Sequence, residues 1–280
     1  MFGRRTTVGR TDEQLVLMRA AGLLVGQTLA AVRAAVSDGV TTGDLDALAE
    51  DFIRSHGGRP SFQEVPGYRH TLCTSTNDEV VHGIPGSRVL RDGDLLSVDC
   101  GAIVAGWHGD AAITVVVGGD EAARPEDLDL SRATDDSLWA GIGAMRAGRR
   151  LYAVGEAIEA SIVAAGQRDG RDYGIVEEYV GHAIGQEMHL DPQIPNYAVK
   201  GKGPILASGF TGALEPMITL GSPATRVLAD DWTVVTEDGS RAAHWEHTVA
   251  IRDAGAWVLT ALDGGAARLA ELGIPYAPVA

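Results

Sequence analysis

Five side chains that can bind metal ions stand far apart in this chain, each beside an apolar or glycine-rich segment. They are Asp99, Asp110, His182, Glu215 and Glu246. A carboxylate that is buried without a partner costs several kcal/mol, and Asp99 stands at the end of a segment dominated by apolar residues. Four carboxylates and one imidazole form an oxygen-rich set, which suits two hard or borderline divalent ions that share carboxylates. Two such ions can hold one water as hydroxide and direct it at a carbonyl or phosphoryl group.

Each of these residues also has a simpler interpretation. Asp99 could cap a turn at the end of a strand, and Glu215 could mark a strand entry, because Pro216 restricts it to extended conformations. Asp110 would return beside Asp99 if residues 101–106 carried the chain around a hairpin. His182 could be an ordinary core or surface histidine.

The composition allows a large aliphatic core. The chain has 280 residues, of which 45% are hydrophobic and 5% aromatic, so it could form one large domain or two small ones. No stretch approaches the roughly 18 apolar residues that span a bilayer, and no apolar signal region follows residues 1–5. Two cysteines, Cys73 and Cys100, are too few for a disulfide framework and fit a reducing cytoplasm.

The charge distribution argues against a general nucleic-acid-binding protein. The net charge is −15, whereas phosphate contacts need clustered lysines and arginines. Arg4, Arg5 and Arg10 nevertheless form a small basic arm over residues 1–10. This arm is either a frayed terminus or a contact with ribosomal RNA.

The chain divides into two similar halves, each with two helices followed by extended segments. Residues 11–14 have the pattern of a capping box that opens the first helix, and apolar residues then recur with helical spacing. Further helices are predicted near residues 44–53, 128–146 and 154–167. Strands are predicted near residues 71–74, 95–104, 111–117, 173–179, 217–220, 232–236 and 247–251. Residues 237–240 predict a hairpin turn, and residues 264–280 have the composition of a tail.

The five ligands and their surroundings resemble one protein family, the type I methionine aminopeptidases. The resemblance covers about residues 11–262 and is strongest in residues 74–85, Thr-Ser-Thr-Asn-Asp-Glu-Val-Val-His-Gly-Ile-Pro, and in the Gly-His-x-Ile-Gly motif around His182. It implies an α+β fold, called the pita-bread fold, in which a curved antiparallel sheet with pseudo-two-fold symmetry carries helices on its outer face. It also implies a single catalytic domain over residues 1–280, with the metal ions between its halves.

The resemblance assigns roles to further residues. His82 and His189 would contact the substrate amide and the developing oxyanion, while Glu215 would bind metal and also move a proton. The methionine pocket would be lined by Tyr68, Cys73, Met188 and Trp232. The sequence departs from the family's pattern at Ala183, where glycine is usual, and around residues 68–70, which could change the local backbone and the rim of the pocket.

The resemblance therefore implies a metal-dependent aminopeptidase with two divalent ions, Co, Mn, Fe or Zn. Its substrate would be the initiator methionine of nascent proteins with a small second residue, and it would be a cytoplasmic monomer without membrane or specific nucleic-acid binding. Two alternatives share the fold. An Xaa-Pro aminopeptidase or prolidase would usually carry an additional N-terminal domain, and a metal-free binding protein would have substituted ligands, whereas all five are present here.

Overall fold

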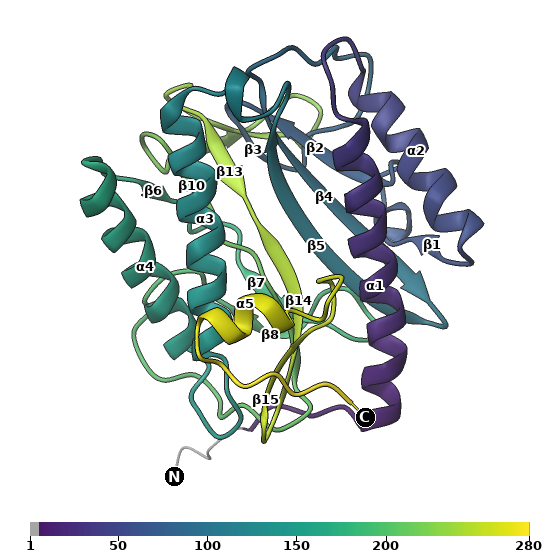
Figure 1. Cartoon of the computed structure of the whole chain (residues 1–280), viewed down its shortest axis with the longest axis vertical. Coiled ribbons are helices and arrows are strands. Elements are labelled where there is room, and N and C mark those ends of the chain that lie inside the picture. Colours follow the sequence, from purple (N-terminus) through teal and green to yellow (C-terminus); the bar gives the residue numbers. More distant parts are fainter. Residues whose placement is uncertain (1–5, 280) are drawn as a thin grey trace.

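An antiparallel sheet of nine strands forms the centre of the structure, a computed structural model that describes residues 6–279 (Figure 1). Its strands are β1 (Arg59–Pro60), β2 (Leu72–Thr76), β4 (Leu95–Val104), β5 (Trp107–Val116), β7 (Gly181–Ala183), β8 (Leu190–Ile194), β9 (Thr211–Leu214), β14 (Glu246–Arg252) and β15 (Gly255–Val258). Seven strands follow the order β1-β4-β5-β14-β9-β7-β8, while β2 also pairs with β4 and β15 with β14. The contact between β5 and β14 joins the two halves of the chain in one sheet.

Two small sheets of three strands each flank one end of the large one. The first contains β6 (Gly174–Ile175), β10 (Met217–Thr219) and β13 (Ala242–His244), and the second contains β3 (Glu79–Val81), β11 (Thr225–Val227) and β12 (Val234–Thr236). The predicted hairpin at residues 237–240 is wrong, because β12 and β13 belong to different sheets. The chain does turn there, but it passes from one sheet to the other.

A long hairpin of β4 and β5 organises the first half. All ten residues of each strand pair, from Leu95 with Val116 to Val104 with Trp107. The turn consists of Ala105 and Gly106, both with positive φ (50° and 80°), as a tight two-residue hairpin requires. The prediction that the chain returns here is confirmed, although residues 101–104 belong to the strand rather than to the turn.

The helices pack on the sheet in two pairs, one for each half (Figure 1). They are α1 (Asp12–Ala35) with α2 (Thr42–Ser55), and α3 (Pro125–Ala144) with α4 (Ala153–Asp169). Thr11 and Gln14 form the predicted capping box at the start of α1, and Thr41 forms a second one with Asp44 at α2. Each pair buries its own aliphatic cluster against the sheet, so the expected α+β architecture with duplicated halves is confirmed.

Helix α1 is long and apolar enough to cross a membrane, judged by length and composition alone. A segment of this kind was not expected from the sequence. In this fold its apolar side, including Leu15, Val25 and Val32, is buried. The helix lies directly on β5, where a Cβ added to Gly109 would come within 2.7 Å of the Gly22 backbone. It is therefore a core helix, and it contacts β5 at Gly109, the residue before Asp110.

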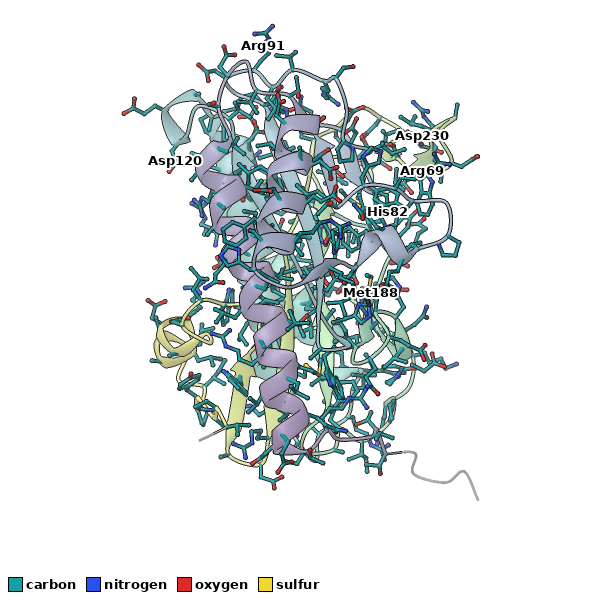
Figure 2. The ribbon with its side chains drawn as sticks, turned by 90° about the vertical axis from the view of Figure 1, so that its right-hand side faces the viewer. Arg69, His82, Arg91, Asp120, Met188 and Asp230 are labelled. Atoms are coloured by element: carbon teal, nitrogen blue, oxygen red, sulfur yellow. The ribbon has the colours of Figure 1, made fainter. Side chains whose placement is uncertain are left out.

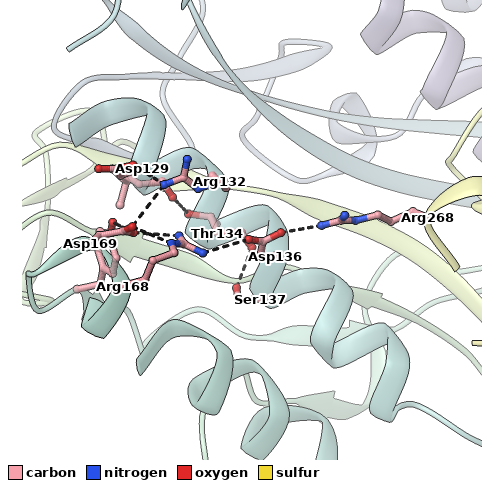
Figure 3. A network of polar contacts seen from close by, with 10 residues as sticks. Asp129, Arg132, Thr134, Asp136, Ser137, Arg168, Asp169 and Arg268 are labelled. Carbon is pink, nitrogen blue, oxygen red and sulfur yellow. Dashed lines mark hydrogen bonds and ion pairs between the residues drawn. The ribbon is translucent and has the colours of Figure 1, made fainter. Parts of the chain in front are cut away.

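The C-terminal segment packs on the sheet instead of forming the predicted tail. It contains the helix α5 (Ala266–Glu271) and buries Leu269 and Ile274, and Tyr276 bridges to Ala256 of β15. A polar network ties α5 to the other helices (Figure 3). In it, Arg268 donates to Asp136 of α3 at 2.6 Å, and Asp136 also lies 3.6 Å from Arg168 of α4. These carboxylates and guanidiniums are partly exposed, so burial of Leu269 and Ile274 contributes more to docking than the ion pairs do.

Candidate metal centre and active-site cavity

The candidate ligands lie on one face of the large sheet, in two adjacent rows that cross its strands. In the first row, Asp99 of β4 pairs with Ala112 of β5, and Ala112 pairs in turn with Glu246 of β14. Side chains of directly paired residues point to the same face, so the two carboxylates flank the small Ala112 side chain. A larger residue at this position would fill the space between them.

The second row supplies the remaining aspartate and the histidine. Asp110 pairs with Gly101, and across the sheet Thr248 and His182 both pair with Ala213. The Thr248 hydroxyl accepts a hydrogen bond from the Asp110 backbone N–H at 3.0 Å and donates one to its carbonyl at 2.8 Å. These bonds join β5 to β14 where the two halves meet.

Glu215 completes the group from the turn that follows β9. One of its carboxylate oxygens lies 3.7 Å from Nε2 of His182, and an Asp110 oxygen lies 3.8 Å from the same atom. The Glu215 carbonyl accepts a hydrogen bond from the Asn196 side chain at 3.0 Å, which holds this turn in place. All five sequence-predicted ligands therefore converge on one site.

Without a cation this site cannot hold all its carboxylates ionised. Burial raises the pKa of Asp99 to about 7. Burial and then repulsion from neighbouring carboxylates raise the pKa of Asp110, Glu215 and Glu246 well above the ordinary range. A buried acid with like charges around it stays protonated unless a positive ion compensates it.

The donor set fits such an ion. Three buried carboxylate oxygens, Oδ1 of Asp99, Oδ1 of Asp110 and Oε1 of Glu246, have no hydrogen-bond partner among residues 6–279. Buried polar atoms are normally paired, so these unpaired oxygens indicate a missing partner. Asp110, His182 and Glu246 each offer one ligand atom within 4.8 Å of the others, which is compact enough for one divalent ion.

His182 is held as a neutral imidazole, the form that can bind a metal ion. Burial lowers its pKa to about 4. Its Nδ1 lies 3.1 Å from the Ala183 carbonyl, so Nδ1–H donates there and the Nε2 lone pair faces Asp110 and Glu215. The methyl group of Ala183 belongs to the aliphatic cluster on the other face of the sheet, so this departure from the family's glycine leaves the ligand face unchanged.

A cavity of about 190 Å³ opens from the ligands, and all of the sequence-predicted site residues line it. They are Tyr68, Cys73, His82, Asp99, Asp110, His182, Met188, His189, Glu215, Trp232 and Glu246. Phe62, Val65 and Val81 also line it and were missed by sequence reasoning. The only local signal for Phe62 was an aromatic residue in the segment between β1 and β2.

The cavity has an apolar part next to the carboxylates. Phe62, Tyr68, Cys73 and Met188 form one buried cluster, with Trp232 packed against it. The Tyr68 and Trp232 rings meet edge to face at 5.0 Å, and the Tyr68 hydroxyl donates to the Leu72 carbonyl at 2.7 Å, which leaves its ring toward the cavity. The rim residues Arg69 and His70 are not among the residues that line the cavity.

The two further histidines stand at the cavity from different sides. His82 follows β3 with a positive φ of 60°, a backbone conformation that costs energy for a residue other than glycine and is common at functional sites. Its ring meets Tyr179 at 5.4 Å, and burial lowers its pKa to about 4. His189 follows a bend, as its glycine-containing segment predicted, and its ring lies 4.5 Å from that of His182. Figure 2 shows His82 and Met188 on the same side of the molecule, below the rim residues Arg69 and Asp230.

His247, the neighbour of Glu246, points to the opposite face, as expected for consecutive strand residues. Its Nδ1 lies 2.7 Å from the Thr260 hydroxyl, and its ring packs on Trp139 at 5.6 Å. These contacts give His247 a structural role.

Known proteins match this chain over nearly its whole length. Residues 16–253 match metallopeptidase family M24. Methionine aminopeptidase 1 of Mycobacterium tuberculosis is 52% identical over 259 residues, which cover 92% of this chain and 96% of that protein. The chain belongs to the type I methionine aminopeptidases. Methionine aminopeptidase 1 of Bacillus subtilis is 43% identical over 90% of this chain and 98% of its own length.

Solved structures agree with this family and with its pita-bread fold. The methionine aminopeptidase of Thermotoga maritima superposes with a TM-score of 0.84 at 38% identity, covering 90% of this chain and 98% of that one. A prolidase from Pyrococcus horikoshii shares the fold at 16% identity with a TM-score of 0.71, but the match covers 63% of that longer chain. The family consists of metallopeptidases, so a divalent metal belongs in the carboxylate-rich site of this aminopeptidase.

Proposed function

We propose that this chain removes the initiator methionine from proteins with a small second residue, and that Asp99, Asp110, His182, Glu215 and Glu246 hold two divalent ions for this reaction. The observation that carries the proposal is that the five candidate ligands and an apolar compartment line the same cavity, side by side. When bound, the ions would lower the pKa of a water and polarise the carbonyl of the first peptide bond.

Selection of methionine follows from the apolar compartment. Tyr68, Trp232 and Phe62 offer broad apolar faces to an unbranched thioether, and Cys73 leaves room between them. The whole cavity, ligand face included, offers about 190 Å³, which is room for one side chain and a terminal amine but little for a preceding residue. Cleavage is therefore confined to the N-terminus of the substrate.

The histidines and Glu215 supply the polar steps. His189, beside His182, donates a hydrogen bond to the carbonyl oxygen as negative charge develops on it. His82 contacts the amide of the scissile bond from the other wall. Glu215 lines the same cavity, so its carboxylate can take a proton from the attacking water and pass it to the leaving amine.

Discrimination at the second residue has a steric basis. The His82 ring meets Tyr179 at 5.4 Å and Trp232 at 6.4 Å, each edge to face. His82 and Trp232 line the cavity, and Tyr179 packs behind His82 and limits its movement, so the side next to the leaving amide is narrow. A small second residue fits there, whereas a bulky one would have to displace an aromatic ring.

The cellular setting follows from the substrate. Proteins that carry an initiator methionine are newly made chains, and two buried free cysteines fit a reducing cytoplasm. We therefore assign the enzyme to the cytoplasm as a monomer. The proposed ribosome contact is not carried by Arg10, whose half-buried guanidinium packs on Trp107, and residues 1–5 lie outside the described part of the chain.

The proposal is tested by removing metal and adding back Mn²⁺, Fe²⁺, Co²⁺ or Zn²⁺ separately. Release of the first residue from Met-Ala-Ser, Met-Leu-Ser and Ala-Pro-Ala peptides is then compared. Metal-dependent release of methionine from Met-Ala-Ser, with little from Met-Leu-Ser, is expected. Cleavage of Ala-Pro-Ala alone would place the chain among the Xaa-Pro enzymes, and no cleavage with any metal would contradict catalysis.

A further inference from the structure

A second buried imidazole lies behind the candidate ligand Glu246. His244 ends β13 and is 1% exposed. Its Nε2 atom lies 3.9 Å from Oε2 of Glu246 and has no hydrogen-bond partner among residues 6–279. None of the roles assigned above uses this side chain.

The backbone of His244 is fixed to the strands that carry the two aspartates. Its N–H donates to the hydroxyls of Ser97 at 3.2 Å and Thr114 at 3.0 Å, and the Thr114 hydroxyl donates to its carbonyl at 2.7 Å. Ser97 precedes Asp99 by two residues on β4, and Thr114 of β5 is the direct partner of Ser97. The imidazole therefore has a defined position relative to the ligand rows.

This position suits a donor to Glu246 better than any other role. A buried imidazole nitrogen needs a partner, and the Glu246 carboxylate is the charged group nearest to Nε2 among the described residues. The separation exceeds hydrogen-bond length by roughly 1 Å. Rotation of the Glu246 carboxylate can close this gap, because its other oxygen, Oε1, is also unpaired.

We infer that His244 is a positioning residue, whose Nε2–H donates to Oε2 of Glu246 when metal is bound and fixes the orientation of that carboxylate. The inference rests on the proposed function only in taking Glu246 as a metal ligand. Hydrogen bonds from outside the ligand set orient the ligands of a metal, and their loss typically weakens affinity by about 10- to 100-fold. His244 thus strengthens metal binding without touching the metal or the substrate.

The test compares His244→Gln, which keeps an N–H donor, with His244→Leu, which fills similar space without one. Dissociation constants of Mn²⁺ and Co²⁺ are measured by calorimetry on the full chain, together with the visible spectrum of bound Co²⁺. We expect His244→Leu to bind about 10-fold or more weakly and to change the Co²⁺ spectrum, while His244→Gln stays within about threefold of wild type. Equal affinity of the Leu variant and wild type would overturn the inference.

The same measurements distinguish a failure of the proposed function from a failure of this inference. If wild-type protein binds no metal, the ligand assignment is wrong; if wild type and His244→Leu bind equally, only the role of His244 is wrong. A measurement on wild type covers the case in which His244→Leu does not fold. On addition of Zn²⁺, the imidazole NMR spectrum should gain a downfield Nε2–H proton that is protected from exchange and absent in His244→Gln, and its absence from wild type would contradict the inference.

Discussion

Cys73 of β2 and Asp99 of β4 are direct antiparallel partners, so a wall residue of the apolar compartment and a candidate metal ligand point to the same face, side by side. In the proposed function, the compartment for the methionine side chain therefore begins next to the site of hydrolysis. Small changes at Cys73 should therefore alter substrate fit without removing a ligand.

Replacing Cys73 with Phe should fill part of the 190 Å³ cavity and exclude the methionine side chain. We expect kcat/KM for Met-Ala-Ser to fall by more than about tenfold, since even one methylene in an apolar pocket is worth about that much. Metal content, measured by mass spectrometry, should stay unchanged. The matched control is Cys100→Ala, on the opposite face of β4, and a similar activity loss there would argue against a pocket effect.

Replacing Asp110 with Asn should abolish metal retention and turnover, yet stabilise the metal-free protein. The substitution keeps the shape of the side chain and removes an acid whose pKa burial and neighbouring carboxylates raise, and which therefore costs the metal-free fold stability at a pH where the unfolded chain is ionised. Near pH 8 we expect the Tm of metal-free protein to rise by about 2–5 °C and the stabilisation by added Mn²⁺ to disappear. Asp51→Asn, at an exposed position, should change neither quantity, and a lower metal-free Tm for Asp110→Asn would contradict the repulsion.

The stability of the metal-free enzyme should fall as pH rises. The pKa of Asp99 is raised to about 7, so the folded state holds protons that the unfolded chain releases near pH 4. Between these values the folded state binds more protons, and the free energy of unfolding therefore decreases with increasing pH. Thermal unfolding between about pH 5 and about pH 8 tests this, and saturating metal should remove the decline because the ion takes the place of the protons.

Replacing His189 with Ala should slow hydrolysis while metal binding is retained. The ring lies beside His182 but is not one of the five candidate ligands, so its loss removes a donor to the reacting carbonyl. We expect kcat to fall by about 100-fold or more, as for other oxyanion donors. His56→Ala, at the exposed end of α2, serves as control. Full activity with metal bound would exclude a catalytic role for His189.

Replacing Arg10 with Ala should loosen the turn that leads to Met188 and His189. The Arg10 guanidinium stacks on Trp107 at 5.9 Å, donates to the Ile184 carbonyl and fills the space beside Gly185. It thereby holds together β5, which carries Asp110, and the segment that follows β7, the strand that carries His182, from outside the cavity. We expect KM for Met-Ala-Ser to rise severalfold with metal content unchanged, whereas Arg33→Ala on exposed α1 surface should leave KM unaltered.

Local patterns predicted much of the fold. The capping box at Thr11, the spacing of apolar residues and the Ala105–Gly106 turn each act between near neighbours, so the sequence displays them directly. The short strands were harder to predict. The extended segment near residues 173–179 contributes only Gly174–Ile175 to a sheet, because strand length there depends on distant partners such as Ile218.

Site residues could be predicted where they lie in recognisable motifs, but not where their position depends on tertiary packing. The five candidate ligands stand in recognisable settings and do converge, but Phe62 begins a single 3-10 turn, Phe62–Glu64, and packs against Tyr68. The tail was mispredicted for the same reason. Small residues and prolines after Gly264 suggest a free segment, whereas Leu269 and Ile274 join an apolar cluster that forms only when the helices α3 and α4 assemble with the sheet.

The row Asp99–Ala112–Glu246 also determines at what stage of synthesis the candidate metal site can form. The aspartates leave the ribosome early, but Glu246 belongs to the penultimate strand and follows them after more than a hundred residues. Chains that emerge N-terminus first can pack α1 on the β4–β5 hairpin while this partner is still missing. With the proposed ligand set, high-affinity metal binding therefore requires that Glu246 has been synthesised, and products truncated before it would compete poorly for scarce ions.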